Sequence, residues 1–520
     1  MGTQIPLQSI YLCVNKHTIG VYEEDIKADM EGVLDRNEML SLMEPMLIGE
    51  TSRHRPALND LALELAQKSA GFRRSLPESM LGSLASLVRA MNCYYSNLIE
   101  GHDTHPVDIE RALKNDYSQD TRKRALQLEA KAHITVQRWI DEGGLRGRAV
   151  SREGICEVHA RFCELLPEDL LWVEDPETKE RVQVIPGELR RRDVKIGGHV
   201  PVSPGALPRF LGRYEEVYGH LSKTDSILSA APAHHRLVWI HPFLDGNGRV
   251  ARLISHAMLL EKLDTGAVWS VARGLARNVE SYKGHLAACD QTWRNDLDGR
   301  GHLSEEALAA FAEFFLGVCI DQVIFMENLM RPDRLRTRIL LWAEEEIRLN
   351  HLLPRSGNVL EAVLYRGELP RGDVAGIVGT QERHARRIVS ALVDRGVLVS
   401  DSSRAPLRLV FPAALASRWM PGLFPGRPDA VTRGELNFVK GNERFVFDRD
   451  VVVFWGMDGE TRVRCEISRE ALDDHFGGDG KDKVDVFRAH RQTIENIARR
   501  KYLAGQTEPD GSVLIRTLEL

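Results

Sequence analysis

Residues 241–252 read HPFLDGNGRVAR, lie between two stretches of helical periodicity, and are the most informative segment of the sequence. In Gly246-Asn247-Gly248 two glycines flank an asparagine, so the backbone can turn tightly and approach a ligand without interference from Cβ atoms. The helix that follows presents unpaired N–H groups at the same place, which favours binding of an anion. Arg249 and Arg252 are three residues apart on that helix and share a face, which suits a polyphosphate.

Two further side chains of this segment fit chemistry on a bound phosphate. Asp245 adjoins the expected anion site, and Mg²⁺ usually takes one or two protein oxygens together with phosphate oxygens. His241 precedes the site by a short loop, and an imidazole with an ordinary pKa of about 6.5 accepts a proton from a hydroxyl near neutral pH. Each residue alone is more often structural, but together they predict nucleophilic displacement on a nucleotide phosphate.

The segment resembles the motif of the Fic family, H-P-F-x-(D/E)-G-N-G-R-x-x-R, at every defined position. The resemblance extends from about Pro56 to Met330. In that family an α-helical bundle transfers AMP from ATP to a protein hydroxyl. The resemblance implies the following roles: His241 as base, Asp245 as magnesium ligand, Gly246, Asn247 and Gly248 as the anion hole for the α- and β-phosphates, Arg249 on the β-phosphate and Arg252 on the γ-phosphate.

The same resemblance bears on the nucleotide and on the reaction. Relatives that phosphorylate have a lysine where this chain has Gly248, which argues against a kinase. Asn278 and Tyr282 fall where related proteins line the adenine pocket. Core packing accounts for Tyr282 equally well.

An upstream helix contains Ser96-Asn97-Leu98-Ile99-Glu100-Gly101. Ser96 and Glu100 are four residues apart and share a helix face, and Gly101 supplies a natural helix end. Such a pair is common on protein surfaces, but it matches the family's inhibitory motif, (S/T)-x-x-x-E-(G/N). The resemblance implies that Glu100 pairs with Arg252, occupies the guanidinium that would hold the γ-phosphate, and keeps the resting enzyme slow.

Residues 186–202 predict a β-hairpin, because Gly197-Gly198 separates two short polar segments. In the resembled family this place is a flap, which holds a target segment by strand addition beside the catalytic histidine. The run Arg190-Arg191-Arg192 fits such a docking role and fits a solvated edge as well.

Length and spacing predict several domains, since the chain has 520 residues and a domain has roughly 100–200. After Pro332, a helix, a short helix at 371–378, a longer helix at 381–395 and extended residues at 397–412 predict a winged helix-turn-helix. A proline-rich run at 421–428 predicts a linker. The predicted divisions are a weakly structured extension at 1–49, a helical region with the inhibitory helix at 50–125, a catalytic core at 126–335, the winged helix at 336–420 and a small α+β domain at 430–520.

The predicted fold class is therefore mainly α: a Fic-type helical bundle with a β-hairpin flap, a winged helix-turn-helix, and a small α+β domain. The last domain resembles a small bacterial family without an assigned function, through residues 463–472 and the later helix. Arg383, Arg386 and Arg387 suit the outer face of a recognition helix on DNA, although Glu382 and Asp394 dilute the basic charge. A winged helix is also commonly a protein-interaction module.

Composition narrows the class of protein further. A net charge of −6 gives no general attraction to nucleic acid or to an anionic membrane. The 7 cysteines are scattered without a C-x-x-C pair, which predicts reduced thiols and a cytoplasmic protein. The longest apolar stretch, 307–326, carries Glu313 and Asp321 and is expected to be a buried helix rather than a membrane span.

The sequence thus predicts a self-inhibited, Mg²⁺-dependent protein adenylyltransferase that releases pyrophosphate. Its expected partner is a protein with a Ser, Thr or Tyr hydroxyl, the chain itself included, and a homo-oligomer and DNA contact through the winged helix are compatible with it. Two alternatives stay open. The same site suits another nucleotide, another phosphate-linked group or removal of AMP, and the chain also fits a DNA-binding regulator whose Fic region senses nucleotide.

Overall fold

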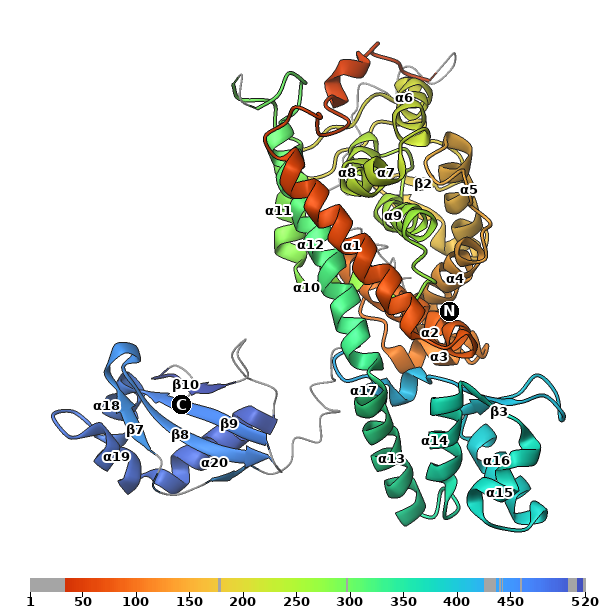
Figure 1. Cartoon of the computed structure of the whole chain (residues 1–520). Coiled ribbons are helices and arrows are strands. Elements are labelled where there is room, and N and C mark those ends of the chain that lie inside the picture. The colour runs from red at the N-terminus through yellow and green to blue at the C-terminus, as the bar shows by residue number, and fades with distance from the viewer. Residues whose placement is uncertain are drawn as a thin grey trace, which may run out of the picture. The chain divides into compact units, whose positions relative to one another are not determined.

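The computed structural model describes residues 33–175, 179–295, 298–424, 436–438, 441, 443–458, 461–503 and 512–517. They form two compact units that divide between Leu423 and Phe424 (Figure 1). The first unit is mainly helical, and the second combines a sheet with three helices. This agrees with the predicted mainly α fold that is followed by a small α+β domain.

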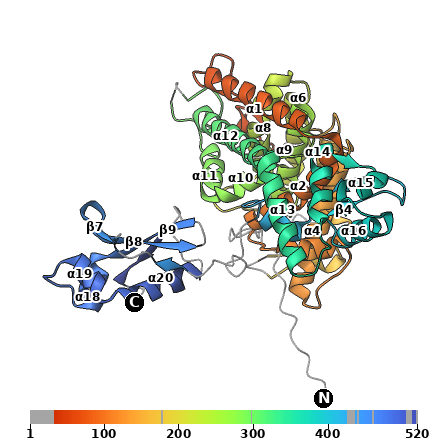
Figure 2. The same cartoon turned by 60° about the horizontal axis from the view of Figure 1, so that its bottom comes forward.

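The helical unit is built around α9 (Asn247–Leu263), which lies inside the bundle in both views (Figures 1 and 2). It packs against α8 (Ala230–Ile240), α4 (Thr121–Asp141) and α5 (Arg152–Cys163). Most residues of its first three turns are buried, as expected for a helix that is surrounded on all sides. The other helices of the bundle are α1 (Arg55–Ser75), α3 (Pro106–Leu113), α6 (Leu207–Gly219), α7 (Lys223–Leu228), α10 (Ala272–Arg277), α11 (Val279–Cys289) and α12 (Glu305–Met330).

Helix α2 (Glu78–Ile99) carries the predicted inhibitory motif. It packs against α4 and α10, and nearly all of its residues from Leu84 onward are buried. The helix ends at Ile99 with Glu100 as its C-cap, and Gly101 follows with a φ of +83°, a left-handed conformation that glycine adopts without strain. The predicted helix end at Gly101 is therefore present.

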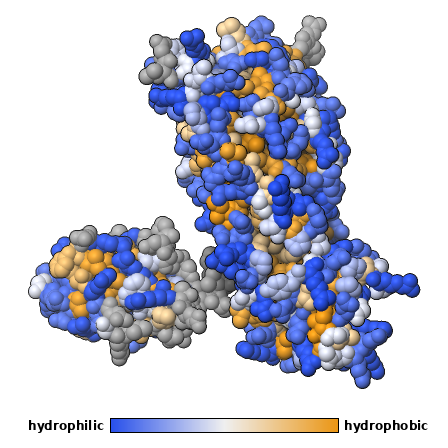
Figure 3. All heavy atoms as spheres, viewed as in Figure 1, coloured by the Kyte–Doolittle hydropathy of each residue, from blue (hydrophilic) through white to orange (hydrophobic). Residues whose placement is uncertain are grey.

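Helix α12 is the one helix of the described residues that is long and apolar enough to cross a membrane. Of the 18 consecutive residues that make up its most apolar part, 61% are buried inside the protein. The helix packs against α1, α8, α10 and α11. On the face that carries α1 and α12, apolar residues are interspersed among hydrophilic ones (Figure 3).

Of the weakly structured segment predicted at 1–49, the structure describes residues 33–49, while 1–32 lie outside the described residues. A short 3₁₀ helix (Leu40–Met43) packs against α6, and Met43 and Met46 are only 0% and 1% exposed. The Tyr218 hydroxyl donates a 2.7 Å hydrogen bond to the Met46 carbonyl. Single side chains of this segment are buried in the bundle at irregular spacing. The sequence therefore shows no helical or strand periodicity there.

The hairpin predicted at 186–202 needs correction. The strand pair lies earlier, between β1 (Trp172–Glu174) and β2 (Arg181–Gln183). Within 186–202 the described pairing is limited to one antiparallel bridge, Ile196 to His199, around the two glycines. Arg190 and His199 of this loop bond to backbone carbonyls at the end of α8, and Asp193 bonds to Arg36 of the N-terminal segment, so side-chain contacts take the place of a strand ladder.

The rest of the first unit follows the predicted order of elements. Helices α13 (Pro332–Arg348) and α14 (Ser356–Arg366) precede β3 (Glu368–Leu369). The short predicted helix corresponds to a 3₁₀ turn (Arg371–Asp373) with α15 (Val374–Val378), and the longer one to α16 (Glu382–Asp394). Strands β4 (Leu398–Val399) and β5 (Leu407–Leu409) complete an antiparallel sheet of order β3-β5-β4, and α17 (Ala416–Trp419) closes the unit.

The second unit holds a five-stranded sheet of order β10-β9-β8-β6, in which β7 also pairs with β8. Its longest strands, β8 (Val451–Asp458) and β9 (Thr461–Ser468), are antiparallel, and alternate residues such as Phe454 and Cys465 face the core. Of the predicted linker, residues 425–428 lie outside the described residues. The remaining elements are β6 (Asn437–Phe438), β7 (Arg444–Val446), α18 (Arg469–Phe476), α19 (Lys483–Ala489), α20 (Arg491–Leu503) and β10 (Val513–Ile515).

Candidate active site

His241 is the residue at which α8 ends, and its backbone is left-handed with a φ of +51°. Its Nδ1 lies 3.3 Å from the Val238 carbonyl oxygen, which can only accept a hydrogen bond. In the neutral ring Nδ1 therefore carries the proton, and Nε2 keeps a lone pair. The side chain can act as a base through Nε2.

The pKa of His241 is lowered to about 3, chiefly by burial and further by the nearby Arg190 and His199. Burial disfavours the charged imidazolium, and a neighbouring guanidinium repels it. At neutral pH the ring is therefore neutral. A pKa this low also makes the ring a weaker proton acceptor than a free imidazole.

The loop after His241 is closed by Asn247. The Asn247 side chain donates a 2.8 Å hydrogen bond to the Phe243 carbonyl and accepts a 3.0 Å hydrogen bond from the Phe243 N–H. Gly246 has a φ of +79°, and the Phe243 ring stacks on His159 at 3.9 Å between centroids. Of the residues implied for the anion hole, Asn247 thus uses its side chain to shape the loop and has only its backbone N–H to offer a phosphate.

The first turn of α9 has no side-chain cap. At Gly248 an added Cβ atom would lie 2.6 Å from Glu100 Oε1, so the Glu100 carboxylate occupies the space in front of this helix start. A carboxylate near a helix N-terminus is typically stabilised by about 0.3–1 kcal/mol. The protein's own carboxylate therefore lies where the sequence predicted an anion.

Arg252 is held by residues of the predicted inhibitory motif. Its Nε donates a 2.9 Å hydrogen bond to Ser96 Oγ, and its Nη2 donates to Glu100 Oε1 at 2.5 Å and to the Ser96 carbonyl at 3.2 Å. The predicted pairing of Glu100 with Arg252 is thus present. The side chains of the pair are 7% and 4% exposed, so little water competes with it.

The charges of this pair depend on each other. Burial acts to raise the pKa of Glu100, but the guanidinium groups of Arg252 and Arg249 outweigh it and hold that pKa below its usual 4.5. Glu100 is therefore an anion at neutral pH. Removal of one partner would leave a buried charge without compensation, which typically costs about 3–5 kcal/mol.

Arg249 is bound differently, by residues that the sequence analysis did not identify. Its Nη2 donates a 3.0 Å hydrogen bond to Glu129 Oε2, and His102 Nδ1 lies 3.0 Å from the same carboxylate oxygen. Arg249 Nε is buried without a hydrogen-bond partner among the described residues. Glu129 braces one end of this guanidinium and leaves other donors free. The only signal in the sequence is that Glu129 falls on the buried face of its helix.

Asp245 fits the magnesium role. Its Oδ1 is buried and has no hydrogen-bond partner within the described part of the chain. Burial raises its pKa, an effect that Arg249 opposes. An unpaired carboxylate oxygen is the ligand that Mg²⁺ prefers. The described residues contain no group of three His, Cys, Asp or Glu side chains that could hold a metal unaided, so such an ion would depend on phosphate oxygens as well.

The two residues implied for the adenine pocket differ in environment. Asn278 is exposed, and its side chain donates a 2.8 Å hydrogen bond to the Gly274 carbonyl. Tyr282 is 3% exposed, and its hydroxyl lies 2.7 Å from His234 Nε2. Tyr282 thus belongs to the packed core in this structure, as the alternative interpretation held.

The three arginines expected to face DNA, Arg383, Arg386 and Arg387, are all exposed on α16. They lie opposite its buried residues Ala385, Ile388, Val389 and Leu392. Arg386 forms a 3.0 Å ion pair with Glu382, one turn before it, which offsets part of the positive charge on this face.

The flap region also contains an unexpected buried charge. Arg190, which the sequence placed in a docking strand or a solvated edge, is 2% exposed. Its Nε donates a 2.8 Å hydrogen bond to the His241 carbonyl, and its backbone N–H donates to the Pro242 carbonyl at 2.9 Å. The neighbouring Arg191 has a side chain that is 73% exposed. Only the neighbour fits a solvated edge.

Comparison with known proteins finds two segments of this chain that match protein families. Residues 149–259 match the Fic/DOC family, and residues 436–515 match a protein family of unknown function, DUF1488. A protein adenylyltransferase Fic of Drosophila ananassae is 29% identical over 224 residues, 39% of this chain and 42% of that protein. The protein of the same name from Drosophila persimilis is 46% identical over 224 residues, 39% of this chain and 41% of that protein.

The chain thus spans less than half the length of these curated relatives. Among solved structures, a Fic family protein from Desulfovibrio desulfuricans aligns with 68% of this chain and 96% of its own. The identity is 16% and the TM-score is 0.39.

Proposed function

We propose that this chain, which carries a domain of the Fic/DOC family at residues 149–259, is a protein adenylyltransferase. The observation that carries the proposal is the place of His241. Its neutral imidazole adjoins a loop that leads into an uncapped helix start, followed by two buried arginines. A base, an anion site and two cations in one place suit transfer of a nucleotide group. The transferred group, AMP, is taken from the names of the matched relatives.

In the proposed reaction, His241 Nε2 accepts the proton of a target hydroxyl while its oxygen attacks the α-phosphorus of ATP. A new P–O bond to the target forms, and the bond from the α-phosphorus to the oxygen that bridges to the β-phosphate breaks. Pyrophosphate leaves with that electron pair. The backbone N–H groups at the start of α9 bind phosphate oxygens, while Arg249 and Arg252 hold the β- and γ-phosphates.

Asp245 is the residue that would hold Mg²⁺, because its buried Oδ1 has no hydrogen-bond partner among the described residues. When bound, the ion neutralises part of the phosphate charge. The positive charge of Arg249 acts on this carboxylate, and Arg249 would also help to hold the phosphates.

Self-inhibition is part of the proposal. Arg252 gives its Nε and Nη2 to Ser96 and Glu100, so these donors are taken before ATP arrives. The Glu100 carboxylate also lies in front of Gly248, where it repels a phosphate. ATP that binds in this state is held with its α-phosphorus out of line for attack.

The experiment that tests the function is a transfer assay with four nucleotides. Glu100→Gly protein is incubated with cell extract, Mg²⁺ and each α-labelled NTP, and labelled residues are identified by mass spectrometry. We expect AMP on Ser, Thr or Tyr hydroxyls from ATP, and no label with the Glu100→Gly/His241→Ala double variant. Label from another nucleotide alone would point to the alternative transferase. Loss of AMP from a pre-labelled extract, without new labelling, would point to removal of AMP.

A second candidate function is DNA binding by the segment from α14 to β5. It is favoured by the exposed arginines on one side of α16, where Arg383 and Arg387 form no ion pair with any residue that the structure describes. A sequence-selective gel shift that weakens with salt and survives His241→Ala would support this function. Equal binding by an Arg383→Ala/Arg387→Ala variant would contradict it.

We place the protein in the cytoplasm. All six cysteines of the described residues are free thiols, and five of them are buried. Free thiols are typical of a reducing compartment. Localisation of the tagged chain in intact cells, followed by fractionation, tests this assignment.

A further inference from the structure

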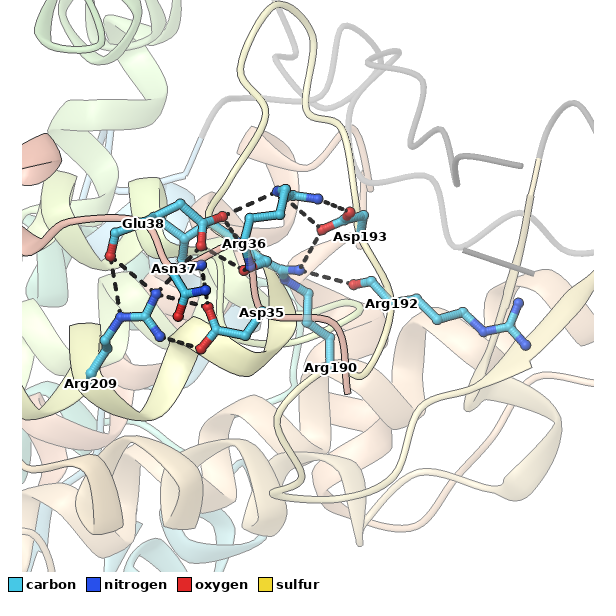
Figure 4. A network of polar contacts seen from close by, with 10 residues as sticks. Asp35, Arg36, Asn37, Glu38, Arg190, Arg192, Asp193 and Arg209 are labelled. Atoms are coloured by element: carbon cyan, nitrogen blue, oxygen red, sulfur yellow. Dashed lines mark hydrogen bonds and ion pairs between the residues drawn. The ribbon is translucent and has the colours of Figure 1, made fainter. Parts of the chain in front are cut away.

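The segment Leu34–Glu38 is fastened to the loop at 190–205 (Figure 4). Glu38 accepts two hydrogen bonds from Ser203, at 2.7 Å from the backbone N–H and at 2.6 Å from the hydroxyl. The Leu34 carbonyl accepts a 2.7 Å hydrogen bond from the Gly205 N–H. A Cβ atom at Gly205 would lie 2.6 Å from Asp35 Cβ, so the two backbones are in close contact.

Charge pairs strengthen this attachment. Arg36 donates to both carboxylate oxygens of Asp193, whose side chain is 4% exposed. Arg209, on α6, forms a two-pronged pair with Asp35. Paired, two-pronged contacts of this kind fix orientation as well as distance. The segment therefore sets the shape of the loop.

Inside the same loop, Arg190 bonds to three backbone carbonyls. Its guanidinium donates to the carbonyls of Arg192 and Val202 within the loop and to that of His241 at the end of α8. Its own N–H donates to the Pro242 carbonyl. A second contact joins the loop to α8, because His199 Nε2 lies 2.8 Å from the Trp239 carbonyl. The loop is thus hydrogen-bonded to the turn that contains His241.

That turn needs support. The backbone of His241 is in the left-handed region, which is disfavoured for residues other than glycine. Such a conformation persists where the surrounding structure enforces it. Arg190 binds the carbonyl of that same residue. Its positive charge faces the imidazole too, and Asp193, Arg36 and Glu38 are the charged groups that act on Arg190 in turn.

We propose that Arg190 is a positioning residue for His241, and that the segment Leu34–Glu38 fixes the loop from which Arg190 acts. The proposal rests on the proposed function, because it concerns the same histidine. The guanidinium fork is essential to it, since one planar group satisfies three carbonyls that a lysine ammonium on a flexible stem reaches poorly. Arg36 acts at a distance, through Asp193.

The test combines a titration with a rate. Protein labelled at histidine with ¹³C and ¹⁵N is titrated by NMR, and the His241 signal is assigned from a His241→Gln sample. Arg190→Met removes the nearby positive charge, so we expect the His241 titration to move to higher pH. Arg191→Met changes a largely exposed neighbour and is the matched control, with an unchanged titration. An identical His241 titration in wild type and Arg190→Met would overturn the proposal.

The second part of the test measures transfer kinetics in the Glu100→Gly background. We expect Arg190→Lys to lower kcat at least about tenfold, with KM for ATP changed less than about twofold, because the base is displaced while the phosphate site is intact. Arg36→Ala should lower kcat in the same sense but less, and it keeps the test available if Arg190 variants unfold. Equal kcat values in all three proteins would overturn the proposal. If no protein transfers AMP, the proposed function fails, and the NMR titration still decides the role of Arg190.

Discussion

Glu100 and Gly248 share one space: a Cβ atom at Gly248 would lie 2.6 Å from Glu100 Oε1 and 3.1 Å from Arg252 Nη1. The glycine at this position has two effects. It lets a carboxylate reach the start of α9, and it lets the carboxylate bind Arg252 at the same time. The anion site and the inhibitory contact are therefore one place.

Gly248→Ala should destabilise the wild-type protein by about 1–3 kcal/mol, because the new methyl group forces the Glu100 carboxylate away from Arg252. In the Glu100→Gly background the same substitution should cost little. Thermal unfolding of the four proteins, evaluated as a double-mutant cycle, measures the difference. Additive effects of the two substitutions would contradict the shared space.

Glu129→Gln should weaken ATP binding, since Arg249 loses the charged brace that orients it. In the Glu100→Gly background we expect KM for ATP to rise severalfold while kcat falls less. Steady-state kinetics over a range of ATP concentrations separate the two. A faster enzyme would instead mark Glu129 as a second inhibitory carboxylate, and the bracing role would then be wrong.

Stability should fall as the pH drops from about 6.5 toward 5. His133 and His234 are buried, and burial lowers the pKa of each to about 3, so both stay neutral in the folded protein. The unfolded chain takes up these protons below about 6.5, which favours unfolding by up to about 1.4 kcal/mol per pH unit for each histidine.

Carboxylates with lowered pKa, such as Glu100, keep their charge until the pH falls below about 4.5, so they contribute outside this window. Calorimetric Tm values at pH 7 and pH 5 test the prediction. His133→Gln removes one titrating group and should reduce the difference in Tm. An equal Tm at both pH values would contradict the neutral, buried state of these histidines.

Much of the site was predictable from short-range patterns. The segment at 241–252 places its loop, helix start and arginines within twelve consecutive residues, and four-residue spacing puts Ser96 and Glu100 on one face. The contact between Glu100 and Arg252 spans 152 positions, and the resemblance to a family supplied it. The order of helices and strands after Pro332 followed from periodicity and from glycine and proline positions.

Other features depend on contacts that leave no local signal. Arg190, Arg191 and Arg192 look alike in the sequence, and only the folded chain buries the first beside the His241 carbonyl, 51 positions away. Residues 33–49 are held by polar contacts of Arg36 and Glu38 and by the buried side chains of Met43 and Met46, which follow no helical or strand period. Asn247 was expected to face phosphate, but its side chain forms two hydrogen bonds with the Phe243 backbone. The neighbouring residues in the sequence do not specify this role.

The central claim is tested most directly by the position of the label in ATP. Initial rates of label transfer to protein are compared for α-labelled and γ-labelled ATP with wild type, Glu100→Gly and Glu100→Gly/His241→Ala. We predict transfer from the α-label alone, at least about tenfold faster in Glu100→Gly than in wild type, a change of about 1.4 kcal/mol or more in barrier height. No transfer should occur without His241. Label from the γ-position, or equal rates for wild type and Glu100→Gly, would contradict the account.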